Sequence, residues 1–340
     1  MSSEPSADAP EPLVKWHEAS VIIAGGSHED LWVHPNLVTI PGDPIVVEVA
    51  LRSTDREGKD AHAETHYFRT DDDFASLSGA EKAEAEAWKR IGLTGEDFEP
   101  TTVDGTDLRE AVWHWARDCV HVDAETMVCP FLTLDGGRHS VRTVAAKPNG
   151  DISSPLYVSN ALTNEVGRGL LEPHIAAHDG RLFMTLRAED SRGYVAVSED
   201  AGRSWGEPRA WTWDDGDIIP MHTTMTKLLA HSDGLLLVYT RIRHDNQSVF
   251  RSRAPLHCAE VDPSTLSLKR STERILVPNR GFPVGNFWVW PIDQQKSYVT
   301  VAEWPRDGRA QNGDTWLVKI HWNRPNELLT PDGHERVAVG

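Results

Sequence analysis

Residues 198 to 205 read Ser-Glu-Asp-Ala-Gly-Arg-Ser-Trp, a polar turn between two stretches with the composition of β-strands. Apolar and polar residues alternate from 193 to 198, as in a strand with one buried face. In such a turn Asp200 can accept hydrogen bonds from backbone N–H groups, Gly202 permits a positive φ, and Trp205 can cover the turn with apolar surface. The pattern S-x-D-x-G-x-S-W therefore predicts a hairpin whose tip is held by its own side chains.

Two other segments carry incomplete versions of this turn. Residues 70 to 74 keep the Thr and the Asp, and residues 133 to 137 keep the Thr, the Asp and a Gly. The complete pattern is the Asp-box, and the chain resembles the sialidase family in it and, more weakly, over most of residues 30 to 322. The resemblance implies an all-β, six-bladed β-propeller of sialidase type, in which degenerate copies of the turn recur from blade to blade. It also implies that the turn lies away from the central site.

Length and composition agree with such a fold. The 340 residues suffice for six or seven blades of roughly 40 to 50 residues each. Thirteen Trp and 21 Pro suit many short strands and tight turns better than helices. We expect a disordered tail over residues 1 to 14 and a single propeller domain over residues 15 to 330.

Most of the chain is expected to be strand and turn. Stretches rich in strand formers predict strands at 44 to 52, 64 to 70, 127 to 134, 140 to 147, 181 to 187, 193 to 198, 234 to 240, 256 to 261, 297 to 304 and 315 to 322. Residues 78 to 118 are rich in helix formers and predict a short helical insertion. The aromatic stretch at 281 to 290 could stack on a sugar ring, but blade packing is its expected use.

Charge and cysteine content restrict the partners. A net charge of −18 argues against nucleic-acid binding, which needs clustered Lys and Arg, so an acidic ligand would require a locally basic centre. Cys119, Cys129 and Cys258 form no C-x-x-C pair and are odd in number, which predicts reduced thiols in a cytoplasmic protein. The N-terminus lacks the features of a signal peptide, and no long apolar run predicts a membrane span. The oligomeric state is not indicated.

The stretch that best matches the sialidase pattern runs from an apolar strand at 44 to 51, through Arg52 and a polar loop, to Asp60. In that pattern the arginine binds substrate and the aspartate is the general acid/base, so the resemblance gives these roles to Arg52 and Asp60. A buried carboxyl group can stay protonated and deliver its proton to a leaving glycosidic oxygen. The alternative is an ordinary solvated loop.

A second match places Glu172, a strand, Arg187, a further strand and the Asp-box in the order that the family shows. The resemblance makes Glu172 the group that polarises the nucleophile and Arg187 a ligand of the substrate carboxylate. For a third arginine we favour Arg253, closely followed by Arg251, because guanidinium groups bind carboxylates in a bidentate manner. The alternative is a structural ion pair or an exposed arginine.

Two positions depart from the family pattern. His34 stands where the first carboxylate-binding arginine is expected, and Glu303 and Trp304 stand where a Tyr-Glu pair would supply the nucleophile. Without that tyrosine the covalent route through a phenolate cannot run, unless Tyr239 or Tyr298 reaches the centre from another strand.

Histidines offer a different chemistry, since the chain has 16 of them. A histidine near the centre could act as a base in hydrolysis or abstract the proton α to a uronate carboxylate in a β-elimination. We predict a sialidase-like glycoside hydrolase that acts on an acidic saccharide, without a cofactor or metal. Its expected catalytic residues are Asp60, Glu172 and His174, and its expected binding residues are His34, Arg52, Arg187, His222, Tyr239, Arg251 and Arg253.

Two alternatives remain open. One is a polysaccharide or oligosaccharide lyase, or another enzyme based on His and Arg such as a cyclase. The other is a propeller that binds a glycan or a protein without catalysis. Convergent carboxylates and arginines favour the hydrolase, convergent His and Tyr favour the lyase, and an apolar or blocked centre favours the binding protein.

Overall fold

The structure is a computed structural model that describes residues 11–24, 31–40, 42, 44–54, 64–78, 81–82, 102–107, 118–147, 155–304 and 313–334. Within these residues the chain forms β-strands, two short 3-10 turns, η3 (Phe250–Ser252) and η4 (Arg270–Thr272), and no α-helix. The prediction of an all-β fold is confirmed.

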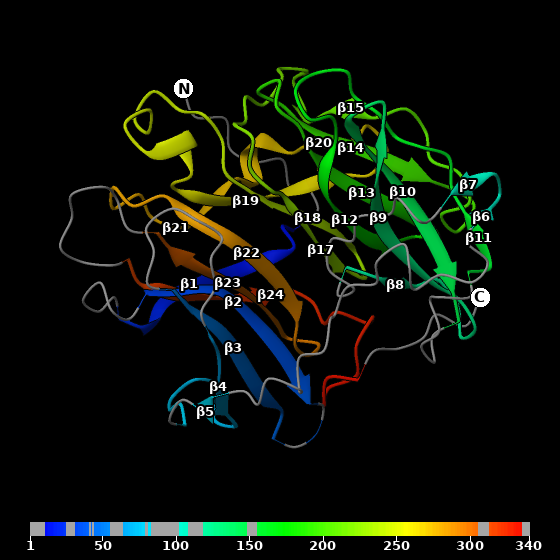
Figure 1. Cartoon of the computed structure of the whole chain (residues 1–340). Helices are drawn as coiled ribbons and strands as arrows, with labels where there is room; N and C mark the ends of the chain where they lie inside the picture. The colour runs from blue at the N-terminus through cyan, green and yellow to red at the C-terminus, as the bar shows by residue number, and fades with distance from the viewer. Residues whose placement is uncertain are drawn as a thin grey trace.

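The strands form five sheets, numbered here along the chain (Figure 1). The first sheet has β2 (Leu31–Ile40), β3 (Val46–Thr54), β4 (Glu64–Thr70) and β5 (Glu81–Lys82). The second has β8 (Val120–His121), β9 (Met127–Asp135), β10 (Arg138–Ala146) and β11 (Tyr157–Val158). The third has β12 (Leu171–His178), β13 (Arg181–Arg187), β14 (Gly193–Ser198) and β15 (Arg209–Ala210).

The fourth and fifth sheets combine strands that are less close in the sequence. The fourth has β17 (Lys227–His231), β18 (Gly234–Tyr239), β19 (Leu256–Asp262), β20 (Ser267–Leu268) and β16 (Thr212–Trp213), with β21 (Arg274–Val277) also paired to β19. The fifth has β22 (Val284–Pro291), β23 (Lys296–Glu303), β24 (Thr315–Trp322) and, from the other end of the chain, β1 (Val14–Ile23). A separate hairpin joins β6 (Thr102–Val103) to β7 (Thr106–Asp107).

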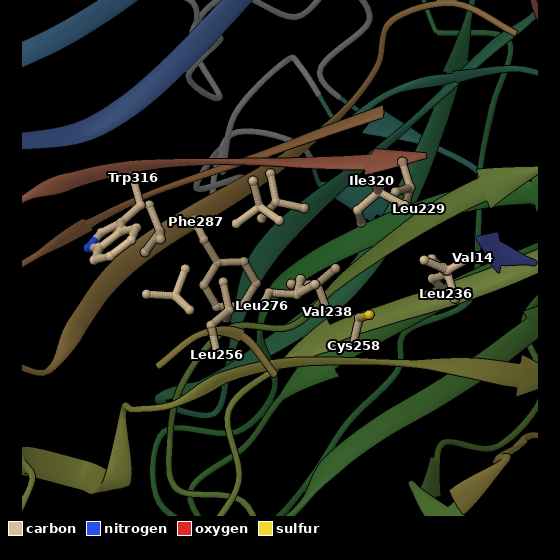
Figure 2. Close-up of a cluster of buried hydrophobic side chains, with 14 of the residues drawn as sticks. Val14, Leu229, Leu236, Val238, Leu256, Cys258, Leu276, Phe287, Trp316 and Ile320 are labelled. Carbon is tan, nitrogen blue, oxygen red and sulfur yellow. The ribbon is translucent and has the colours of Figure 1, made fainter. Parts of the chain in front are cut away.

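Neighbouring sheets pack face to face through buried apolar side chains. Figure 2 shows the core between the fourth and fifth sheets, where Leu229 and Val238 meet Phe287 and Ile320. Similar clusters join the second sheet to the third, the third to the fourth, and the fifth to the first. The first strands of successive sheets also lie side by side, β12 against β17, β17 against β22 and β22 against β2. This arrangement is that of propeller blades around an axis.

The number of blades stays a prediction. The described residues supply five sheets and the small β6–β7 hairpin, and the apolar clusters of the described residues include none that joins the first sheet to the second. In the aromatic stretch, Phe287 and Trp288 are buried within β22, which agrees with the expected role in packing.

The Asp-box turn is held by its own side chains, as predicted. Ser198 Oγ donates to the Asp200 carboxylate at 2.8 Å and accepts the Gly202 N–H at 2.8 Å. Ser204 donates its N–H and its hydroxyl to the same carboxylate at 2.8 and 2.6 Å. Gly202 has a φ of +80°, in the left-handed region that favours glycine.

The same turn joins the third sheet to the second. Trp205 is buried, and its indole N–H donates to Thr143 Oγ1 of β10 at 2.9 Å. That hydroxyl in turn donates to the Gly202 carbonyl at 2.8 Å. The turn is therefore part of an interface between blades and not only a surface loop.

The turn after β4 repeats this geometry without the Gly and the Trp. Thr70 Oγ1 donates to Asp72 at 2.8 Å and accepts the Phe74 N–H at 3.1 Å, and Ser76 donates twice to the Asp72 carboxylate, at 2.9 and 2.6 Å. Phe74 occupies the place of the Gly with a φ of +67°. Leu77 takes the place of the Trp and packs against the core between the first and fifth sheets. The incomplete pattern therefore marks a real structural repeat.

Part of the predicted disordered tail is ordered. Residues 1–10 lie outside the described residues, but Leu13 and Val14 are buried in the core between the fourth and fifth sheets. The Leu13 N–H donates to Glu260 Oε1 at 2.6 Å, and β1 pairs antiparallel with β24 along its whole length. Residues 11–14 are thus part of the folded domain, because the first strand completes the last sheet.

The helical insertion expected over residues 78 to 118 is wrong for the part of the segment that the structure describes. Residues 81–82 form β5 and residues 102–107 form the β6–β7 hairpin. Residues 83–101 and 108–117 lie outside the described residues. Pairing with β4 overrides the helix propensity of residues 81–82, as tertiary contacts commonly do.

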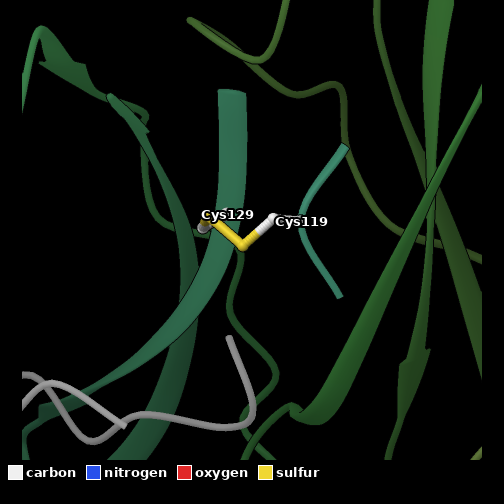
Figure 3. The surroundings of a disulfide bond; sticks show 2 residues. All are labelled: Cys119 and Cys129. Carbon is white, nitrogen blue, oxygen red and sulfur yellow. A yellow bond between two sulfur atoms is a disulfide. The ribbon is translucent and has the colours of Figure 1, made fainter. Parts of the chain in front are cut away.

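The expectation of three reduced thiols is also wrong. Cys119, just before β8, forms a disulfide with Cys129 of β9 (Figure 3), while Cys258 is a buried free thiol. Sequence spacing alone could not show that two chain segments would meet here. Reduced thiols were one argument for a cytoplasmic location, and that argument no longer holds. The location stays a prediction.

Candidate functional site

Glu172 and Arg187 meet where β12 begins and β13 ends. Arg187 Nη1 lies 2.7 Å from Glu172 Oε1, and its Nε donates to Thr223 Oγ1 at 2.8 Å. The pairing of the two strands shifts between Leu171 and His174, and Glu172 has a φ of +45°. The bulge re-aims the Glu172 side chain, as bulges beside functional sites commonly do. The predicted pair is thus an ion pair with largely buried side chains, 15% and 8% exposed.

Arg251 comes to the same place from the loop between β18 and β19. It lies in η3 with a φ of +53°, followed by Ser252 at +48°. Buried Asn246 holds this loop, because its side-chain N–H groups donate to the carbonyls of Arg241 and Ala254, both at 2.9 Å. Non-glycine residues in left-handed conformations persist only where the surrounding contacts enforce them, and they gather at functional sites.

Arg168 and Glu189 complete the cluster. Arg168 Nη2 lies 2.6 Å from Glu189 Oε1, and the Arg168 backbone N–H donates to Glu189 Oε2 at 3.0 Å. Arg168 stands between two glycines with positive φ, and a Cβ on Gly169 would approach the His139 carbonyl oxygen to 2.2 Å. The chain therefore needs glycine here to present Arg168.

We define the arginine site as Arg168, Glu172, Arg187, Glu189, His222, Thr223 and Arg251. Burial lowers the pKa of Arg251, and the positive charges of Arg187 and Arg168 lower it further. Hydrogen bonds from Arg168 lower the pKa of Glu189 and keep it ionised. Burial and the nearby Arg251 lower the pKa of His222, so this imidazole is neutral at pH 7. Three guanidinium groups against two carboxylates leave the site cationic in an acidic protein.

Beside the arginine site a second polar cluster connects the second, third and fourth sheets at β8, β12 and β17. Lys227 Nζ of β17 lies 2.8 and 3.0 Å from the two carboxylate oxygens of Asp118, which precedes β8. His174 of β12 accepts the Leu228 N–H at Nδ1, at 3.1 Å, and its Nε2 lies 3.6 Å from Asp118 Oδ1. Burial lowers the pKa of His174 well below its usual range. We call Asp118, His174 and Lys227 the buried cluster.

The structure brings together four of the predicted residues, namely Glu172, Arg187, His222 and Arg251. Arg253 lies two residues after Arg251 and is partly buried. His174 belongs to the buried cluster two residues after Glu172, and its exposed fraction is 12%.

Tyr239 does not reach the arginine site. It is fully buried, its hydroxyl donates to Glu273 Oε1 at 2.6 Å, and burial raises its pKa. Tyr298 donates its hydroxyl to Asp73, in the turn after β4. Neither tyrosine that sequence analysis considered as a substitute nucleophile is therefore placed for that role.

Three predicted residues cannot be placed in the site. Asp60 lies outside the described residues. His34 falls in β2, where the register shifts between Val33 and Asn36, and Arg52 pairs with Thr65 within the first sheet. Only the backbone is described for His34 and Arg52, so their roles stay predictions.

The position where a nucleophilic tyrosine was expected is structural. Glu303 is buried, and its carboxylate accepts hydrogen bonds from Arg280 at 3.1 and 2.5 Å. Trp304 packs so tightly on Gly285 that a Cβ there would lie 1.8 Å from the indole nitrogen. These residues fix the ends of β22 and β23.

Sequence reasoning missed Arg168, Glu189, Thr223, Asp118 and Lys227. The Gly-Arg-Gly sequence at 167 to 169 could have predicted a turn with Arg168 at its tip. Asp118 and Lys227 gave no local sign, because they are far apart in the chain and meet only in the fold.

Other features of the described residues do not add to the arginine site. A cavity of about 540 Å³ lies between the first and fifth sheets, lined by Asp73, Lys296 and Tyr298 among others, and it includes no residue of the arginine site. The described residues contain no group of three or more His, Cys, Asp or Glu arranged to hold a metal ion. None of the elements in the described ranges is a helix that could span a bilayer.

Comparison with solved structures supports the propeller-like fold. The sialidase of Trypanosoma rangeli in complex with the inhibitor DANA matches with a TM-score of 0.55 and 13% identity, over 90% of this chain and 60% of the sialidase. A protein of unknown function from Dyadobacter fermentans matches with a TM-score of 0.56 and 12% identity, over 89% of this chain and 98% of that one. An exo-1,5-α-L-arabinanase from a bovine ruminal metagenomic library matches at a TM-score of 0.43 and 10% identity, over 86% and 94% of the two chains, too low to carry an argument.

The trypanosomal sialidase is a glycoside hydrolase, and its similarity supports a propeller-like fold for this chain. At such identities the likeness shows the fold and not the activity. The chain spans about three fifths of the trypanosomal sialidase. No protein-family model and no curated protein matches the sequence.

Proposed function

We propose that the protein is a glycoside hydrolase that acts on a saccharide bearing an anionic group, bound at the arginine site. The observation that carries the proposal is the meeting of Arg187 and Arg251 beside Glu172, with a net positive charge inside an acidic protein. Guanidinium groups form charge-assisted hydrogen bonds with carboxylate, sulfate or phosphate oxygens. Backbone strain at Glu172 and Arg251 supports a functional role for the same place.

The roles follow from the chemistry of each group. Arg187 is held on two sides and presents its remaining N–H donors to the anion, while Arg251 supplies a second cation. Glu172 accepts a proton from the attacking water, and Asp60, by its resemblance to the sialidase acid/base, protonates the leaving glycosidic oxygen. Hydrolysis by water needs no tyrosine, which suits a chain whose Tyr239 and Tyr298 are engaged elsewhere.

A lyase is the second candidate, and His222 is the observation that favours it. A neutral imidazole beside Arg251 has the properties of a base that removes a proton α to a carboxylate whose charge the arginine neutralises. A binding propeller without catalysis would use the same arginine site without needing Glu172 or His222.

The test is a screen of aryl glycosides, including a sialoside and a glucuronide, together with ultraviolet absorbance on polyuronides. We expect release of the aryl alcohol, abolished by Glu172→Gln and by Asp60→Asn. Arg187→Lys should raise KM about tenfold or more, because a lysine cannot reproduce the two-sided contacts of the guanidinium.

Arg243→Lys is the matched control, since the Arg243 side chain pairs with Asp245 and Arg243 is not a member of the arginine site. Its KM should stay unchanged. A rise in ultraviolet absorbance on polyuronides that is lost in His222→Gln would show that the enzyme is a lyase and not a hydrolase. Binding of an acidic saccharide without turnover of any substrate would support the third reading, a propeller that binds its ligand without catalysis.

A further inference from the structure

The buried cluster has a covalent tether one residue away. Asp118 is followed directly by Cys119, and the disulfide fixes Cys119 to Cys129, which is fully buried in β9. The strand that follows, β8, has only two residues, Val120 and His121, so few backbone hydrogen bonds hold this end of the segment. The disulfide therefore adds a covalent link between the segment that carries Asp118 and the long strand β9 (Figure 3).

Asp118 neutralises the buried ammonium group of Lys227. Lys227 is 2% exposed and Asp118 is 4% exposed, and both carboxylate oxygens contact the ammonium group. A buried ammonium that loses its partner must regain water or another counter-charge, which favours local opening. The position of Asp118 thus decides whether Lys227 stays buried.

The same carboxylate lies next to the arginine site. His174, with Nε2 3.6 Å from Asp118, stands two residues after Glu172 in the bulged strand. Lys227 begins β17 four residues after Thr223, whose hydroxyl accepts from Arg187. Asp118 therefore braces the two segments that position Glu172 and Arg187.

We propose that Asp118 is a positioning residue of the arginine site and that the Cys119–Cys129 disulfide controls it as a redox switch. With the bond intact, Asp118 holds Lys227 and His174 and the site is assembled. A dithiol reductant attacks the disulfide at Cys119, the less buried of the two cysteines, breaks the S–S bond and leaves two thiols while it becomes a cyclic disulfide. Asp118 is then released, and Lys227 opens to solvent. The inference rests on the proposed site but not on which ligand it binds.

The test follows Lys227 directly. Native protein is treated briefly with N-hydroxysuccinimidyl acetate, which transfers its acetyl group to the lysine Nζ and releases N-hydroxysuccinimide, and each lysine is quantified by mass spectrometry. We expect acetylation of Lys227 to rise about tenfold or more after dithiothreitol treatment, as for a group exposed by local opening. The double variant Cys119→Ser and Cys129→Ser should give the same rise without reductant.

Two comparisons make the outcome specific. Lys269, whose side chain is 40% exposed, should react equally in all samples, and Cys258→Ala, which removes the thiol outside the disulfide, should leave Lys227 protected. Asp118→Asn should expose Lys227 with the disulfide intact, and reduction should then add nothing.

Equal protection of Lys227 in the oxidised and reduced proteins would overturn the proposal. So would a similar rise at the partly buried Lys296 and Lys319 with loss of the folded circular dichroism signal, because the bond would then stabilise the whole fold. Neither result depends on turnover of a saccharide, so failure of the proposed function would be seen separately in the glycoside screen.

Discussion

At the scale of single residues, strain and repulsion at the arginine site oppose stability. Glu172 and Arg251 of the site, and Ser252 next to Arg251, have positive φ, between +45° and +53°. Burial and two nearby guanidinium groups also lower the pKa of Arg251 and so disfavour its charge in the folded state. Replacement of residues in such a site is therefore expected to raise the free energy of unfolding of the protein.

Arg251→Asn should therefore stabilise the protein while it weakens anion binding. Asparagine tolerates the left-handed conformation and removes the repelled charge, so we expect the free energy of unfolding to rise by about 0.5–1 kcal/mol. Urea denaturation measures this. Arg243→Asn is the control, because Asp245 raises the pKa of Arg243 and favours its charge in the folded protein. That variant should be slightly destabilised, and equal shifts in both variants would refute the argument.

His257 makes the fold sensitive to acid. It is fully buried against Tyr239, and burial lowers its pKa from 6.5 to about 4. Since the folded pKa is below the unfolded one, protonation favours unfolding, and stability present above pH 6.5 is lost as the pH falls toward 4. The loss attributable to this residue is at most about 3 kcal/mol. His257→Phe should flatten the pH dependence of unfolding between pH 7 and pH 4.5, whereas exposed His334→Phe should not.

At the scale of elements, the turn of the Asp-box type is the repeating unit that ties one blade to the next. Asp200 accepts two hydrogen bonds from Ser204 and one from Ser198, so Asp200→Ala leaves several donors without a partner. We expect a loss of about 1–3 kcal/mol in the free energy of unfolding. Glu199→Ala, next to it and exposed, should change the stability by less than about 0.5 kcal/mol. Similar losses in both variants would mean that the turn is not held by Asp200.

The strands that could be predicted differ in kind from those that could not. β9, β10, β13, β14, β18, β19, β23 and β24 match the expected ranges closely, because they are flanked by turns and are rich in strand-forming residues. Four first strands, β2, β12, β17 and β22, were missed, as was β1. β12 and β17 carry Glu172, His174 and Lys227, whose polar side chains break the apolar pattern of a strand. The strand character of these two segments is thus hidden, whereas β13, which ends in Arg187, was predicted.

The residues of the site were predictable to the degree that they are local. Glu172 and Arg187 are 15 residues apart and belong to one pair of strands. Their order in the chain was therefore enough to predict that they lie at the same site. Asp118 and Lys227 are 109 residues apart, and only the packing of two sheets brings them together. Cys119 and Cys129 are an exception, since they are only 10 residues apart and their pairing depends on where the second sheet begins.

At the scale of the whole molecule, the charge is divided between an acidic exterior and a cationic centre. The net charge of −18 repels anionic polymers at long range, while the arginine site attracts an anionic group at short range. Since salt screens the exterior more than a partly buried site, association with a small anionic saccharide should speed up as ionic strength rises. Stopped-flow binding of such a ligand at 20 and 200 mM salt tests this, and slower association at the higher concentration would contradict it.

The first and the last of the described strands pair with each other in the fifth sheet. β1 pairs with β24, Leu13 is buried, and its N–H donates to Glu260 of the fourth sheet. Deletion of residues 1–10 should therefore leave the melting temperature within about 2 °C of the full chain, because it removes only the predicted tail. Leu13→Ala should cost about 2–4 kcal/mol through the cavity it leaves, and deletion through residue 23 should expose the edge of β24 and abolish cooperative unfolding. Cooperative melting of that longer deletion, followed by circular dichroism, would show that the fifth sheet is stable without its N-terminal strand.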